Sequence, residues 1–177
     1  GLFHTAQAAT IHLAEVRGSI NPGSADYILE SLKQAENNKA DLFVLRLDTP
    51  GGLLASTRLI IQGFNETRTP VLVWVSPGGA SATSAGALLA ISSHILVMQK
   101  GTNLGAAHPV GGSGEEIKGP MGEKITNDTA ALARSQASLR GRNQEAAERI
   151  VTKSQSFSAE EAVKDRVADF IADDLDT

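Results

Sequence analysis

The sequence predicts an α/β fold in which a mainly parallel β-sheet is flanked by helices. Short runs rich in Val, Ile and Leu alternate with longer segments of helical spacing through the first half of the chain. This order implies right-handed crossover connections, which make the strands parallel. The composition agrees, because 41% of the 177 residues are hydrophobic and 20% are charged. With no sharp boundary in composition, we expect one domain over residues 1–177.

Strands are expected where short apolar runs are bounded by turn residues. The run at 70–75 (PVLVWV) is continuously apolar, which is typical of a strand covered on both faces. The other expected strands lie at 9–16, 41–47, 94–98 and 167–171.

Helices are expected in the segments between these runs. The residues at 22–24 mark a turn and the start of the first helix, and a polar, Gly-rich excursion at 111–122 precedes the last group and is expected to be mobile. The expected helical segments are 25–36, 53–64, the residues from Ser84 to about Ser92, and two or three helices within 125–164.

Composition excludes several classes of function. The net charge of −4 and the lack of a Lys/Arg cluster exclude a nucleic-acid binding surface. The sequence has no cysteine, which excludes thiol catalysis and cysteinyl zinc, and no pair of histidines has the spacing of a metal site. No run reaches the length of a membrane span, and the N-terminus lacks the charged and apolar regions of a signal peptide.

A serine in the segment 77–86 (PGGASATSAG) is the first candidate for chemistry. Ser84 starts a helix of small residues, and the backbone N–H of Ala85 could stabilise an oxyanion there. The alternative is that Ser81, Thr83 or Ser84 only caps the helix. The local sequence favours neither interpretation.

The segment 48–52 (DTPGG) is the second candidate. A strand that ends in Gly51 and Gly52 exposes backbone N–H groups at the carboxyl edge of the sheet, where parallel α/β sheets place their sites. By itself the segment is equally an ordinary Pro-Gly turn. Lys124, taken alone, is read as a solvated surface charge.

Taken together, four segments resemble the NfeD family of membrane-associated serine proteases, which are encoded beside stomatin-like genes. They are LDTPGG (47–52), SATSAG (81–86), GTNLGAAHP (101–109) and KITN (124–127), with FSAEEA (157–162) near the end. The order and spacing are those of the family, and the likeness covers almost the whole chain. Four ordered segments are far more specific than any one of them.

The resemblance implies a ClpP/crotonase-like fold of repeated ββα/βα units and a serine endopeptidase with a Ser–Lys dyad. At the matching positions, Ser84 is the nucleophile and Lys124 the general base. Gly51 or Gly52, together with Ala85, supplies the backbone oxyanion hole. No cofactor and no metal are implied.

His108 offers a second candidate base. The wider Clp protease superfamily uses Ser-His-Asp, and His108 falls about where that histidine would lie. The position of the triad Asp is occupied by Ser154, so His108 would lack its orienting carboxylate. We therefore favour Lys124 and expect His108 to line a substrate subsite or to form a structural hydrogen bond.

A lysine base carries its own requirement. Its ordinary pKa of about 10.4 must fall by a few units, so apolar surroundings are expected for the Lys124 ammonium. We expect the segment 111–122 to act as a flap that brings Lys124 to Ser84. A substrate strand is expected to bind beside Gly78 and Gly79 by main-chain pairing.

Two other functions remain open from the sequence. A crotonase-like acyl-CoA enzyme would use the same backbone amides with a carboxylate as acid or base, and a non-catalytic domain would only bind peptides or assemble membrane partners. For the protease, the expected substrate is the apolar C-terminal segment of a stomatin-like protein. The resemblance further implies a homodimer, and an extracytoplasmic domain of a longer protein that is anchored in the membrane through other segments.

Overall fold

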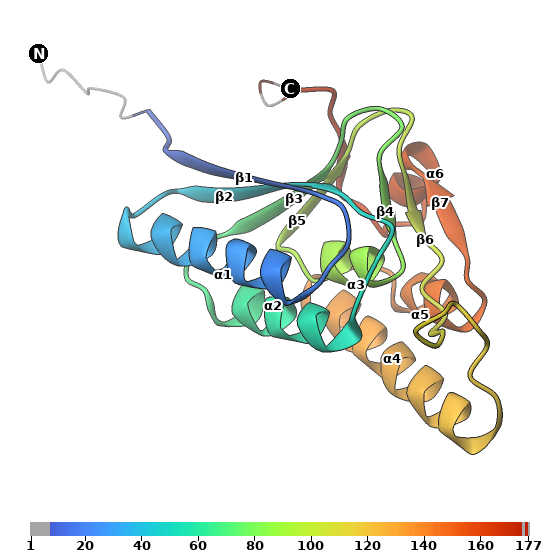
Figure 1. Ribbon diagram of the computed structural model, residues 1–177. Helices are drawn as coiled ribbons and strands as arrows, with labels where there is room; N and C mark the ends of the chain where they lie inside the picture. The colour runs from blue at the N-terminus through green and yellow to red at the C-terminus, as the bar shows by residue number, and fades with distance from the viewer. Residues whose placement is uncertain (1–7, 175, 177) are drawn as a thin grey trace, which may run out of the picture.

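Parallel strands form the centre of the molecule, as the sequence predicts. The structure is a computed structural model that describes residues 8–174 and 176. A five-stranded sheet has the order β1-β2-β3-β5-β8, and all its neighbouring strands are parallel. In Figure 1 the helices α1, α2 and α3 lie together beneath this sheet. The elements are β1 (Ile11–Arg17), α1 (Pro22–Asn37), β2 (Leu42–Asp48), α2 (Leu54–Glu66), β3 (Val71–Val75), β4 (Ser81–Thr83), α3 (Ala85–Ile91), β5 (Ile95–Met98), β6 (Asn103–Gly105), α4 (Gly119–Leu139), α5 (Gln144–Thr152), β7 (Ser156–Ser158), α6 (Ala159–Lys164) and β8 (Phe170–Ile171).

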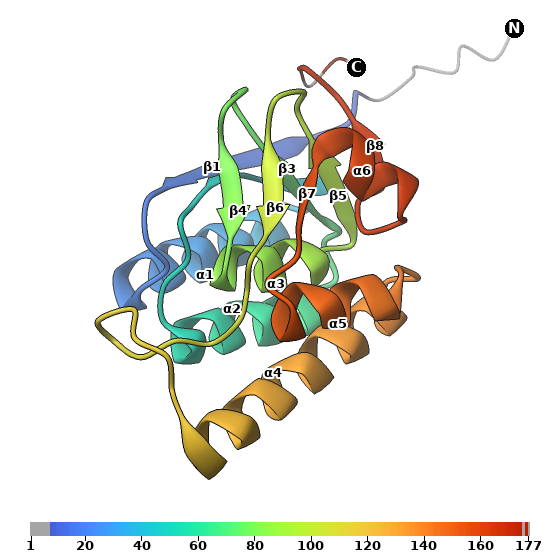
Figure 2. The same ribbon diagram turned by 90° about the vertical axis from the view of Figure 1, so that its right-hand side faces the viewer.

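A second, small sheet was not predicted by the sequence. Its order is β4-β6-β7, with β4 and β6 parallel and β6 and β7 antiparallel. Figure 2 shows these three strands standing beside the large sheet, with α4 and α5 below them. Each strand has only three residues, which is too short for an alternating pattern to be visible in the sequence. β4 matters for function because it leads directly into Ser84.

One predicted helix start is confirmed and one boundary is wrong. The first helix begins at Pro22, within the predicted start at 22–24, because Asn21 and Ser24 cap it reciprocally and Pro22 occupies its first turn. The long helix α4 begins at Gly119, so the end of the predicted 111–122 excursion is helical. Pro120 lies in the first turn of α4, where a missing N–H costs nothing.

The main core lies between the large sheet and its helices. It is formed by one face of each central strand, where alternate residues are fully buried against the helices. Phe43, Leu45 and Leu47 of β2 are each 0% exposed, as are Val73 and Val75 of β3. The period-two burial of these strands follows from the pleat of the sheet.

The opposite face of the large sheet is only partly covered. Strand β3 is itself buried apart from Leu72, much as the apolar run at 70–75 predicts. Leu72 is partly exposed, and Leu13 and Phe170 are 51% and 61% exposed. The register places these side chains on the same face. We call this surface the open sheet face; its members are Ile11, Leu13, Leu42, Leu72, Trp74, Ile95, Val97 and Phe170.

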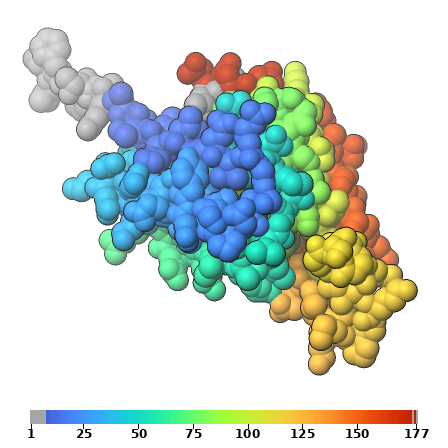
Figure 3. Space-filling model, viewed as in Figure 1, coloured from blue at the N-terminus to red at the C-terminus, as the bar shows by residue number. Residues whose placement is uncertain are grey.

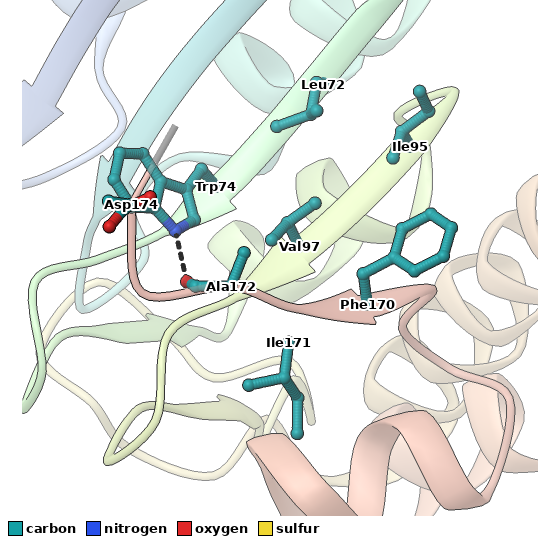
Figure 4. A pocket seen from close by; sticks show the side chains of 8 residues that line it. All are labelled: Leu72, Trp74, Ile95, Val97, Phe170, Ile171, Ala172 and Asp174. Atoms are coloured by element: carbon teal, nitrogen blue, oxygen red, sulfur yellow. Dashed lines mark hydrogen bonds between the residues drawn. The ribbon is translucent and has the colours of Figure 1, made fainter. Parts of the chain in front are cut away.

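A hollow of about 330 Å³ lies on the open sheet face (Figure 4). The chain crosses it just after β8, where the indole N–H of Trp74 donates a hydrogen bond of 3.2 Å to the carbonyl of Ala172. The Arg46 guanidinium lies 5.4 Å from the Trp74 ring, near Glu15 at 3.9 Å. The indole is thus satisfied at its polar edge, while its apolar surroundings stay open to solvent.

Candidate functional site

Ser84 occupies a strained turn between β4 and α3. Its backbone has φ 57° and ψ −123°, a conformation that residues other than glycine rarely adopt. Such a conformation costs of order 1–3 kcal/mol and is found mainly at functional sites. The capping interpretation is wrong for all three candidate residues: the Ser84 side chain makes no cap hydrogen bond, and the hydroxyls of Ser81 and Thr83 bond to each other at 2.5 Å.

The backbone around Ser84 is fixed by neighbours from three segments. The N–H of Ser84 donates to the carbonyl of Gly105 at 2.8 Å, and the N–H of Thr83 donates to the carbonyl of Thr49 at 3.1 Å. Gly105 itself touches the chain at Gln155, because a Cβ on Gly105 would lie 2.2 Å from the Gln155 carbonyl oxygen. The turn is therefore held from both sides, which is what a strained residue requires to persist.

The predicted oxyanion-hole residues do lie around Ser84. A Cβ on Gly51 would come within 2.7 Å of the Ser84 Cβ, so only glycine allows this approach. The Gly51 N–H is occupied, because it donates to the Thr49 Oγ1 at 3.1 Å. Within the part of the chain that the structure describes, the N–H groups of Gly52 and Ala85 have no hydrogen-bond partner. Gly52 and Ala85 thus each have a free N–H group on the wall that Ser84 also lines.

Ser84 opens into a hollow of about 510 Å³ whose walls are largely apolar. Gly52 and Ala85 line it beside Ser84. The walls come from the start of α2, from α3, from the segment after β6 and from α4. Their apolar side chains are Leu53, Leu54, Leu88, Val110, Ile117 and Ile125. A hollow of this size and character suits apolar side chains of an extended peptide.

The structure does not bring Lys124 to Ser84. Lys124 lies within α4 and is exposed, so the apolar surroundings expected for it are absent in this single chain. The neighbouring Ile125 and Thr129 line the hollow of Ser84, whereas Lys124 is not among the lining residues. Figure 3 shows the preceding loop in yellow and the start of α4 at one corner of the molecule.

His108 is turned away from Ser84. Its Nδ1 lies 3.1 Å from the carbonyl oxygen of Val151, which gives a structural hydrogen bond of the kind expected. His108 lines a second hollow of about 700 Å³ with Glu116 and Glu123, and Ile117 borders both hollows. The flanking Ala107 and Pro109 line the hollow of Ser84 instead. Alternate residues of this extended segment thus face different hollows.

Gly78 and Gly79, the predicted substrate-binding glycines, lie apart from Ser84. They form the turn before β4, at the opposite end of that strand from Ser84, and the Gly79 N–H donates to the carbonyl of Gly101 at 2.8 Å. Neither residue lines the hollow of Ser84.

Thr49 is a site residue that sequence reasoning missed. Its side chain is 1% exposed, and its hydroxyl bonds both the N–H and the carbonyl of Gly51. A threonine two residues before a glycine in a turn is a known arrangement for such a bond, so the segment 48–52 did carry the signal.

Groups that could hold a metal ion are absent from the described residues 8–174 and 176, where no cluster of three His, Cys, Asp or Glu has the required arrangement. Over the same residues, no helix has the length and apolar character needed to cross a bilayer.

Comparison with known proteins gives a consistent result. The model of the family described as the NfeD1b N-terminal domain matches residues 10–174. The membrane-bound protease PH1510 of Pyrococcus horikoshii is 36% identical over 168 residues, which cover 93% of this chain. The chain spans only 38% of the length of that relative.

Solved structures agree on the fold. A lysine-to-alanine form of the 1510-N membrane-bound stomatin-specific protease, in complex with a substrate peptide, has a TM-score of 0.89 and 34% identity, over 95% of this chain and 77% of that one. A serine-to-alanine form of the same domain has the same TM-score and identity, over 96% and 83%. ClpP1 from Listeria monocytogenes, at 17% identity and a TM-score of 0.75 over 93% of each chain, shares the fold, so the predicted ClpP-like α/β fold is confirmed.

Proposed function

Because the chain belongs to the family of the NfeD1b N-terminal domain, we propose that it is a serine endopeptidase with a Ser84–Lys124 dyad. The observation that carries this proposal is the strained conformation of Ser84 on the wall of an apolar hollow, beside the N–H groups of Gly52 and Ala85, which have no hydrogen-bond partner among the described residues. The serine-to-alanine and lysine-to-alanine forms of the similar protease domain support the choice of these two residue types.

The proposed reaction begins when the Ser84 Oγ attacks the carbonyl carbon of the scissile peptide. Neutral Lys124 accepts the hydroxyl proton, and the Gly52 and Ala85 amides stabilise the oxyanion that forms. Lys124 then gives the proton to the leaving amine, which departs and leaves an acyl-enzyme. Water hydrolyses this ester and restores Ser84. The reaction needs no cofactor.

Lys124 must move, or be covered, before it can act. In this structure its side chain is exposed to solvent and does not line the hollow of Ser84. Ile125 already lines the hollow, so a peptide bound there would lie close to the first turns of α4. We propose that the loop before α4 and these turns close over the substrate and exclude water from Lys124.

A crotonase-like acyl-CoA activity is less well supported. That chemistry needs a carboxylate as acid or base, and among the residues that the structure describes, none that lines the hollow of Ser84 is Asp or Glu.

The proposed substrate is instead the apolar C-terminal segment of a stomatin-like protein, by analogy with the stomatin-specific protease. Since the relatives are named as membrane proteins, we propose that residues 1–177 act as the extracytoplasmic protease domain of a membrane-anchored protein.

Lys124→Ala and His108→Ala test the base. With a peptide that copies an apolar stomatin C-terminal segment, kcat for Lys124→Ala is expected to fall about 100-fold or more, the usual effect of losing a general base. His108→Ala should stay within about threefold of the wild type, because His108 faces another hollow. Cleavage is measured by mass spectrometry over time. The reverse pattern would make His108 the base, and no cleavage by the wild type would favour a peptide-binding domain.

We further propose that the chain forms a homodimer in which a second copy covers the open sheet face. Parallel sheets are nearly always covered on both faces, and the rim of this face carries both signs of charge in Glu15 and Arg46.

Phe170→Ser is expected to weaken the dimer at least about 10-fold, because Phe170 is 61% exposed in the single chain. Sedimentation equilibrium measures the dissociation constant. Leu139→Ser, at a 58% exposed position on α4, is the matched control; if this variant dissociates instead, the interface lies elsewhere.

A further inference from the structure

Thr49 is a buried polar residue that the proposed catalytic reaction does not use. It follows β2 directly and is 1% exposed. Its Oγ1 accepts the Gly51 N–H at 3.1 Å and lies 3.3 Å from the Gly51 carbonyl oxygen, to which it donates. Both polar groups of Gly51 are therefore in contact with one hydroxyl. A buried hydroxyl with two such bonds fixes the conformation of the segment that it bridges.

The conformation that Thr49 fixes is the one that leaves the Gly52 amide free. Gly51 has φ 115°, a backbone region open to glycine, and its carbonyl also accepts the Ile20 N–H at 2.8 Å. With the Gly51 N–H and carbonyl both engaged, the next N–H, that of Gly52, remains unpaired among the described residues and borders the hollow of Ser84. Loss of the hydroxyl would release the Gly51 N–H and allow this turn to rotate.

Thr49 is also joined to the other half of the site. Its backbone N–H donates to the Ser81 carbonyl at 2.7 Å, and its carbonyl accepts the Thr83 N–H at 3.1 Å, so Thr49 is paired with β4 just before Ser84. Its methyl group packs on Gly86, where a Cβ would lie 2.3 Å from the Thr49 Cγ2. Gly86 follows Ala85, whose N–H is the second proposed oxyanion donor. Thr49 thus contacts the segments that carry both donors and the nucleophile.

We infer that Thr49 is a positioning residue whose hydroxyl sets the Gly52 amide for the oxyanion of the acyl-transfer reaction, while its methyl and backbone only hold β4 and α3 in place. This inference rests on the proposed function. It assigns separate roles to the two branches of one side chain. Two substitutions separate these roles: Thr49→Val keeps the shape and the methyl but loses the hydroxyl, and Thr49→Ser keeps the hydroxyl but loses the methyl.

The two substitutions are expected to have different effects: Thr49→Val should lower catalysis, and Thr49→Ser should lower stability. For Thr49→Val, kcat should fall about 10- to 100-fold with KM within about threefold of the wild type, less than the loss of a direct oxyanion donor. Its affinity for a peptide aldehyde, whose adduct with Ser84 mimics the oxyanion, should fall by a similar factor. Thr49→Ser should keep kcat within about threefold, yet unfold at a lower temperature, because its missing methyl leaves a void against Gly86.

Three outcomes would overturn the inference: equal kcat in the two variants, a loss of kcat in folded Thr49→Ser, or a change confined to KM. If Thr49→Val does not fold, Thr49→Ser still decides, because a less stable but fully active enzyme is the predicted result. Hydrogen exchange of the Gly51 amide gives a readout independent of activity: it should be protected in the wild type and in Thr49→Ser. If the wild type cleaves no peptide, the proposed function fails, whereas a rapidly exchanging Gly51 amide in the wild type contradicts the Thr49 bond itself.

Discussion

Ser84→Ala is expected to lower kcat/KM for peptide cleavage by about 10⁴-fold or more, the largest effect of any single substitution in the site. The hydroxyl of Ser84 forms the covalent bond to the acyl group, whereas the other hydroxyl among the described residues that line the hollow, that of Thr129, donates to the Ile125 carbonyl at 2.7 Å. Removing a nucleophile from a serine hydrolase leaves only the contribution of binding and of the oxyanion hole. Initial rates with a fluorogenic apolar peptide measure the effect.

Stability provides the control for this substitution. The Ser84 backbone has φ 57°, which glycine adopts without strain, so Ser84→Gly should be more stable than Ser84→Ala by about 1 kcal/mol while both are inactive. Ser135→Ala, at an exposed position on α4, should keep full activity. If Ser84→Ala retains most of the cleavage, the activity belongs to another residue or to a contaminant. If Ser84→Gly is less stable than Ser84→Ala, the strained turn is not formed in solution.

Arg142→Met is expected to lower the free energy of unfolding by about 3 kcal/mol, the largest effect on stability. The Arg142 side chain is 2% exposed and pairs with Asp169 at 2.6 Å. It also donates to the carbonyls of Ile91 and Ser93 at 2.9 and 2.7 Å. Burial lowers the pKa of Arg142, and the charge of Asp169 opposes this shift. Without the guanidinium, the two carbonyls lose this donor, and the Asp169 carboxylate loses its positive partner while it keeps the Leu96 N–H.

The helix that precedes Arg142 in the chain supplies the matched control. Arg134 on α4 pairs with Glu148 at 3.0 Å, but both side chains are 41% exposed. Exposed pairs contribute little, so Arg134→Met should cost less than about 1 kcal/mol. Urea unfolding at constant m-value measures both variants. Similar costs for the two would mean that burial of the Arg142 pair does not determine its contribution.

The strands of the large sheet could be predicted from the sequence because each has a local signal. β2 and β3 are apolar runs bounded by turn residues, and the structure places them within one or two residues of the predicted bounds. The small sheet could not be predicted, because β4, β6 and β7 are short and pair over long distances; Leu104 meets Phe157, for example. What forms these strands is their partner, which a local pattern does not contain.

The candidate site could likewise be predicted from the sequence only in part. The segments around Ser84 and Gly51 were found from the sequence, because a glycine pair after a strand and a serine among small residues are local features. The sequence did not show which of Gly51 and Gly52 has a free N–H group. The buried Thr49 hydroxyl decides this, because it accepts the Gly51 N–H and leaves the Gly52 N–H available. The alternation of Ala107, His108 and Pro109 between two hollows also depends on the path of the chain.

The sequence by itself determined the family, the parallel α/β fold and the residue types of the proposed chemistry, because these depend on local runs and on ordered motifs. Tertiary structure decided how those residues meet: the strained turn of Ser84, the direction of His108 toward Val151, the exposed place of Lys124 and the uncovered face around Trp74. The physical reason is that burial and hydrogen-bond partners come from segments far apart in the chain, and each of these features is set by such a partner or by its absence among the described residues.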